Sequence, residues 1–198
     1  MNTEEREFLE NRNLVFTELG RFNVTFEYAT HSFKSCIKNI LINNGLENQT
    51  YADCLTDKLT AEPIKTIFQS FILHYFKSEE DKQKVNKIIS SFSDLIEIRN
   101  LVIHCFWVIG VVVKEPVEPL IVGLKTRISK KGVSIYNLNF ELKELIVLNN
   151  KLNDFNDLIY ELDTHIKEKN ENLIEFNSSL IEKLSFRKEL NKMKSDLK

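Results

Sequence analysis

Apolar residues recur three or four positions apart along several long stretches, and this spacing limits the possible folds more than any other feature of the sequence. It gathers the apolar side chains on one stripe of a helix. The stretches cover roughly residues 14–43, 60–76, 78–106 and 140–180. Only 5 Gly and 3 Pro occur in 198 residues, so few positions break a helix. The pattern predicts a mainly α-helical, antiparallel bundle and disfavours an all-β sandwich or a Gly-rich nucleotide loop.

Start and stop signals accompany these stretches. Two asparagines and a glycine at 43–45 are expected to end the first helix. Thr60 is a suitable cap for the second helix, and Ser78 with Asp81 forms a Ser-x-x-Asp start signal for the third. Asn139 is expected to cap the last helix.

A different pattern covers residues 107–138. The segments VIGVVV, LIVGLKTRIS and VSIYNLN are β-branched and partly alternating, and KEPVEP and KKG separate them. They predict a small antiparallel β-meander of two or three strands that lies on the helices, because so small a sheet is marginal alone. The predicted organisation is therefore one helical domain at 10–166 that contains the meander, followed by a C-terminal helical extension at 167–198. The residues from Arg187 onward are polar and are expected to be frayed.

The stretch after Asn139 has a heptad-like seam. It is either one long helix or a pair bent near 167–172, and intramolecular packing is favoured over dimerisation for its role. The seam residues are Leu145, Leu148, Leu152, Phe155, Ile159, Leu162, Ile166, Leu173, Phe176 and Leu180.

Charge and cysteine content restrict the function. The formal net charge is -2, which excludes a strongly basic nucleic-acid coat protein. Three separated cysteines form no CxxC, and the start of the chain is polar, so a reduced cytoplasmic location without a membrane span is predicted. The four histidines are scattered without zinc spacing, so neither a metal nor another cofactor is predicted.

One segment, Glu97–Trp107, is not explained by the packing of a helical bundle alone. Arg99 falls within the apolar stripe, where a guanidinium is costly unless it reaches a polar partner or a cleft. His104 lies about 140° round the helix from Arg99, on the side that carries Asn100 and Glu97. Asn100 is four residues earlier and can hold the imidazole by a hydrogen bond. A polar edge beside an apolar stripe suits a cleft at a subunit interface.

This segment resembles the signature of the HEPN superfamily, in which an Arg, usually followed by a polar residue, precedes a His by four to six residues. Arg99, Asn100 and His104 match that signature, and Cys105 stands where many members have Gly. The resemblance covers about residues 10–166. It implies a homodimeric, metal-independent endoribonuclease with a shared site, in a toxin–antitoxin or anti-phage defence setting with a possible antitoxin or defence partner protein.

The residue types suit that chemistry. RNA carries its own nucleophile, the 2′-hydroxyl, and cleavage needs a base, an acid and a cation near the phosphate. His104 can serve as base or acid, and Arg99 can grip phosphate oxygens. Two copies of the motif facing each other would supply both base and acid. Asn100 would orient His104, with Glu97 as a weaker supporting candidate.

The expected RNA contacts are basic residues of the meander: Lys125, Arg127, Lys130 and Lys131. A second option is Arg187, Lys188, Lys192 and Lys194. The meander residues can equally protect a sheet edge from aggregation, and Arg99 with His104 can be a structural pair. The alternative function is a non-catalytic helical module that binds a partner protein. A nucleotidyltransferase is disfavoured, because the chain lacks its Gly-Ser and paired-Asp signature.

Overall fold

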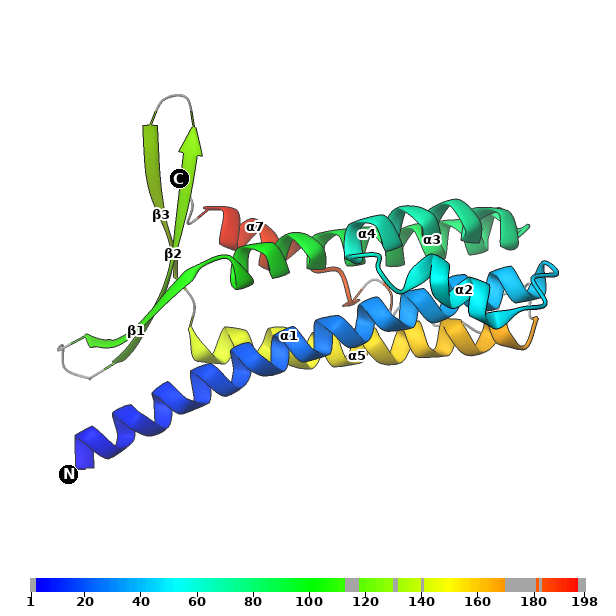
Figure 1. Cartoon of the computed structure of the whole chain (residues 1–198). Helices are drawn as coiled ribbons and strands as arrows, with labels where there is room; N and C mark the ends of the chain where they lie inside the picture. Colours follow the sequence, from blue (N-terminus) through cyan, green and yellow to red (C-terminus); the bar gives the residue numbers. More distant parts are fainter. Residues whose placement is uncertain are drawn as a thin grey trace.

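The computed structural model describes residues 3–112, 118–129, 132–139, 141–169, 181 and 183–195. Long helices lie side by side along one axis, and a three-stranded sheet stands at one end of them (Figure 1). The predicted fold class, a helical bundle with a small antiparallel meander inserted before a long C-terminal helix, is confirmed. The helices are α1 (Thr3–Asn43), α2 (Gln49–Thr56), α3 (Ala61–Tyr75), α4 (Glu79–Ile103), α5 (Leu142–Lys167) and α7 (Arg187–Ser195).

Several helix ends follow the local signals in the sequence. α1 ends at Asn43, and Gly45 then takes a φ of 97°, which favours glycine. The Ser78 hydroxyl accepts a hydrogen bond from the Asp81 backbone N–H at 3.2 Å, so the predicted start of α4 is confirmed. Asn139 is the last residue of a strand and does not cap α5. Glu141 takes that place, in a capping box with Glu144 that satisfies two backbone N–H groups.

The long helices do not all run in alternating directions. Glu18 meets Asn149 and Thr25 meets Asn156, so the sequence offset between α1 and α5 stays constant and these two helices are parallel. α4 follows α3 after a short connection and runs in the opposite direction to it (Figure 1). α1 is the common element, because it contacts α2, α3, α4 and α5.

A cluster of aromatic rings forms the centre of the core. Phe33 of α1 stacks on Phe92 of α4 with ring centroids 4.2 Å apart, and it meets the edge of Phe68 of α3 at 4.8 Å. Phe155 of α5 completes the contact between the four long helices. The seam residues from Leu145 to Ile166 are all buried in this core, as the preferred interpretation expects. The seam positions at 173, 176 and 180 lie outside the described residues.

The sheet comprises β1 (Phe106–Val112), β2 (Glu118–Ser129) and β3 (Gly132–Asn139) in the order β1-β2-β3, and both pairs are antiparallel. On β1, Trp107 packs against the helical core, whereas Phe106 points outward and is 72% exposed. The expectation that Phe106 continues the apolar stripe of α4 is therefore wrong. The helix ends at Ile103, and strand alternation then turns Phe106 away from the core.

Arg187–Ser195 forms the helix α7, so the prediction that these residues are frayed is wrong. Leu190 and Met193 of α7 are buried in the main core despite the polar composition. Ion pairs fix the rest of α7 to the bundle. Arg187 pairs with Asp94 of α4 at 2.9 Å and Lys151 of α5 pairs with Glu189 at 2.9 Å. Two further pairs are Lys192 with Glu144 and Lys194 with Glu97.

Candidate functional site

The last two turns of α4 and the residue that follows them carry the four residues predicted to be catalytic. Glu97, Arg99 and Asn100 are helical, and His104 is the residue at which the helix ends. The backbone carbonyl of Val102, which the ending helix leaves without a helical partner, accepts a hydrogen bond from Trp107 Nε1 at 2.8 Å. The indole therefore fixes the end of α4, and with it the turn that carries the candidate residues.

Arg99 emerges from the apolar stripe into a polar environment. Its guanidinium lies over the ring of Phe26, 5.9 Å from the centroid, which is a cation–π contact with α1. Its Nη1 donates to Asn100 Oδ1 over a long 3.4 Å. Its Nε is buried and has no hydrogen-bond partner. The free-energy cost of placing a guanidinium in this apolar stripe is therefore only partly offset by the contacts of Arg99 with Phe26 and Asn100.

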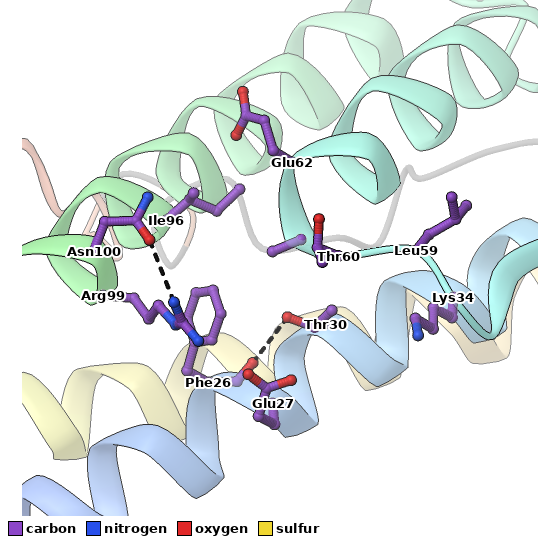
Figure 2. A pocket seen from close by; sticks show the side chains of 11 residues that line it. Phe26, Glu27, Thr30, Lys34, Leu59, Thr60, Glu62, Ile96, Arg99 and Asn100 are labelled. Carbon is purple, nitrogen blue, oxygen red and sulfur yellow. Dashed lines mark hydrogen bonds between the residues drawn. The ribbon is translucent and has the colours of Figure 1, made fainter. Parts of the chain in front are cut away.

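Arg99 and Asn100 line a pocket of about 390 Å³ between α1, the start of α3 and α4 (Figure 2). Phe26, Thr30 and Lys34 lie on the same face of α1, one turn apart, and Glu27 stands beside them. The remaining lining residues come from the connection before α3, its first turn and α4: Leu59, Thr60, Ala61, Glu62 and Ile96. The volume lies within the range of about 300–1,000 Å³ that small-molecule sites occupy.

His104 and Glu97 are not among the residues that line this pocket. His104 is exposed at the end of α4, and in the described part of the chain no hydrogen bond joins it to Asn100. Glu97 is exposed and pairs with Lys194 of α7. Within one chain the structure thus brings Arg99 and Asn100 together and leaves His104 and Glu97 apart from them.

The predicted RNA contacts fall into two groups. Lys125 and Arg127 lie on β2, but their side chains are not described, and Lys130 and Lys131 lie outside the described residues. The second group lies on α7. Three of its four cations form ion pairs within the chain: Arg187, Lys192 and Lys194. Lys188 is exposed and forms no ion pair with a described residue. Internal pairing makes these three poor candidates for phosphate contacts.

The pocket-lining residues of α1 were not predicted from the sequence. Phe26 belongs to the apolar stripe, and Thr30 and Lys34 follow it at intervals of four residues. This spacing is the available signal, because it places the three side chains on one helix face. The sequence does not say that the face meets Arg99, since that depends on how α1 packs against α4.

Two carboxyl groups of the bundle are held in different ways. Burial raises the pKa of Asp94 above its ordinary value, although the adjacent Arg187 acts in the opposite direction. The nearby Glu97 carboxylate raises the Asp94 pKa further. Asp163 lies elsewhere, on α5, and accepts hydrogen bonds from Ser35 at 2.7 Å and Asn39 at 2.8 Å.

The cysteines are free thiols, and two of them are buried. Burial raises the pKa of Cys36 well above its ordinary value, and the neighbouring Asp163 carboxylate raises it further. A buried, protonated thiol is a poor nucleophile, so Cys36 acts as a small packing residue.

No protein-family model, no curated protein and no solved structure matches this chain. Among the described residues, His, Cys, Asp and Glu side chains form no group of three or more that could hold a metal ion. None of the helices described here is both long and apolar enough to cross a membrane.

Proposed function

We propose that the chain is a HEPN-type endoribonuclease that acts as a homodimer without a metal ion, in the cytoplasm. The observation that carries the proposal is the state of Arg99. It is a half-buried guanidinium with an unpartnered Nε at the edge of a pocket, five residues before an exposed histidine. The guanidinium of such an arginine carries N–H groups that can donate to phosphate oxygens.

The proposed reaction is attack of the RNA 2′-hydroxyl on the adjacent phosphorus. The attacking oxygen loses its proton to one histidine, the bond from phosphorus to the 5′-oxygen breaks, and a second histidine gives that oxygen a proton. The products are a 2′,3′-cyclic phosphate and a 5′-hydroxyl. Arg99 neutralises charge on the phosphate as the attack proceeds.

A second copy of the chain supplies what one copy lacks. One chain has a single His104, and its imidazole lies apart from the pocket that Arg99 lines. Exposed apolar side chains flank His104, namely Ile103 at 37%, Phe106 at 72% and Val108 at 39%. Such a surface suits self-association, which would bring two imidazoles together across a two-fold axis. The setting proposed for this activity is toxin–antitoxin or anti-phage defence, with an antitoxin or defence protein as a further partner.

The test is RNA cleavage by the purified chain in EDTA. Wild type is expected to cut RNA, and His104→Ala to lose at least about 100-fold in rate, because base or acid catalysis contributes that much. His74→Ala is the matched control, since His74 is also exposed but lies in the last turn of α3, away from the pocket that Arg99 lines. Equal cleavage by wild type and His104→Ala would refute the proposal.

A partner-binding module remains the second candidate, because Phe106 and Val108 expose apolar surface on β1. The seam of α5 gives it no support, since the described seam residues are buried within the chain. Light scattering combined with the cleavage assay separates the two functions. A monomer that leaves RNA intact favours the partner-binding module, whereas a dimer that cleaves RNA favours the nuclease.

A further inference from the structure

The pocket beside Arg99 is larger than phosphate capture at a cleavage site needs. It extends along α1 from Phe26 past Thr30 to Lys34, which are two successive helical turns. Figure 2 shows Arg99 and Asn100 at one end of the row of lining side chains and Lys34 at the other. The proposed nuclease reaction leaves most of this volume unused.

The Arg99 end of the pocket is built for an oxyanion. The buried Nε of Arg99 has no partner, and the amide group of Asn100 is a donor because its oxygen already accepts from Arg99. The first turn of α3 also lines the pocket, and its cap residue, Thr60, makes no side-chain capping bond. A guanidinium and an amide group at one end of the pocket suit a phosphate group, whose oxygens accept several hydrogen bonds.

The opposite wall offers acceptors. Glu27 is exposed in the pocket, and among the described residues no ion pair reaches it. The other acidic lining residue, Glu62, is paired with Lys65 at 2.5 Å. An unpaired carboxylate beside an anion site accepts hydrogen bonds from sugar hydroxyls, as the acidic residue of dinucleotide-binding folds does with ribose.

We propose that this pocket binds a sugar phosphate, with the phosphate on Arg99 and Asn100 and the sugar hydroxyls on Glu27 and Thr60. Lys34 closes the far end, where its ammonium donates to the backbone carbonyl of Asp57 at 2.9 Å. A ribose phosphate unit occurs both as a free metabolite and within an RNA strand, so either source fits this chemistry. The proposal shares Arg99 with the proposed nuclease but does not need His104, which is not among the lining residues.

The experiment is isothermal titration of the full chain with ribose 5-phosphate, inorganic phosphate, ribose, a 5′-mononucleotide and a short RNA. Ribose 5-phosphate is expected to saturate one site per chain, and Arg99→Ala to weaken its binding at least tenfold. Arg99→Lys keeps the charge but loses the planar fork, and is expected to weaken binding severalfold. Glu27→Gln should weaken ribose 5-phosphate but leave inorganic phosphate unchanged or tighter.

Two further variants make the result interpretable. Lys188→Ala removes one exposed positive charge outside the pocket and is expected to bind like wild type. His104→Ala removes the histidine of the proposed cleavage and should still bind ribose 5-phosphate, so failure of one proposal does not imply failure of the other. Thermal melting confirms that each variant is folded.

The outcomes divide as follows. Binding of ribose 5-phosphate or the mononucleotide that depends on Arg99 would identify the ligand as a free sugar phosphate. Binding of RNA alone that depends on Arg99 would identify the ligand as a unit of an RNA strand. Both results support the proposal. It is overturned by an absence of binding to all probes, by inorganic phosphate binding as tightly as ribose 5-phosphate, or by equal binding in folded Arg99→Lys and wild type.

Discussion

A buried polar pair fixes the register between the two parallel helices. Asn149 of α5 is fully buried, and its Nδ2 donates to the Glu18 carboxylate at 2.6 Å and to the Glu18 backbone carbonyl at 2.9 Å. Arg21 approaches the same carboxylate only at 3.7 Å. The buried carboxylate of Glu18 therefore depends mainly on one amide group, and a one-residue slip of α5 would leave it without a donor.

Replacing Asn149 by Ala should destabilise the chain by about 2–3 kcal/mol, because a hydrogen bond to a buried charged group is lost. Chemical denaturation monitored by circular dichroism measures the change in the free energy of unfolding. Asn150→Ala is the control, since the neighbouring Asn150 is exposed and its side-chain oxygen accepts a hydrogen bond from Arg21 at 3.2 Å. If Asn149→Ala lowers the free energy of unfolding no more than Asn150→Ala does, water must replace the hydrogen bonds that Asn149 donates to Glu18.

At the scale of elements, α7 shows how a polar segment becomes ordered. Its nine residues include two that are buried, and the cations around them pair with carboxylates of α4 and α5. Only some of these pairs involve buried groups. Asp94 has a side chain 3% exposed, whereas Glu97 is 48% exposed and contributes little. The Asp94–Arg187 pair is therefore the contact through which pH acts on α7.

The direction of that pH effect follows from the raised pKa of Asp94. A carboxyl group with a higher pKa in the folded chain holds its proton more tightly there, so Asp94 costs stability as pH rises from about 4 through its raised pKa. Asp94→Asn removes this cost. The free energy of unfolding of Asp94→Asn minus that of wild type should therefore increase from pH 4 to pH 7, as measured by urea titration.

Arg187→Met serves as the companion variant. Arg187 lowers the pKa of Asp94, so its loss should raise that pKa further and make the stability of the chain fall more steeply with pH. The steeper dependence should vanish when Asp94→Asn is added. A difference between Asp94→Asn and wild type that shrinks with rising pH would contradict this account and show that the attraction of Arg187 outweighs burial.

At the scale of the whole molecule, a close contact joins the sheet to the end of the bundle. Gly123 of β2 pairs with Trp107 of β1, and a Cβ at Gly123 would lie 3.1 Å from Cys105 Cβ and 3.3 Å from the Trp107 ring. The same Trp107 donates to the last turn of α4. The position of the sheet is thus coupled to the turn that carries Asn100 and His104.

Two Gly→Ala substitutions should have opposite effects. Gly123→Ala is expected to cost about 1–3 kcal/mol, because Cys105 and Trp107 must shift to admit the new methyl group. Gly20→Ala should stabilise by about 0.5–1 kcal/mol, since Gly20 is inside α1 with no neighbouring atom within 4 Å of the new Cβ. Thermal melting of both variants checks this; an unchanged Gly123→Ala would mean that the sheet is loosely attached.

The sequence predicts those parts of the fold that depend on local pattern. The apolar stripes, the Ser78 cap and the strands of the meander each reflect short-range geometry, and the structure confirms them. The order of α7 depends instead on contacts with α4 and α5. The pocket depends on how α1 meets α4, so Arg99 could be named as a candidate but Glu27 and Lys34 could not. The proposed catalytic roles of Arg99 and His104 stay predictions.

The parallel pairing of α1 with α5 also affects biosynthesis. About 100 residues separate the end of α1 from the start of α5, so at about 5–20 residues per second the ribosome leaves roughly 5–20 s between them. Throughout that interval the apolar face of α1 is not covered by α5, the helix with which it makes its most extensive contact. We therefore expect a truncation that stops before residue 142 to accumulate as aggregate, because the apolar face of α1 then stays uncovered.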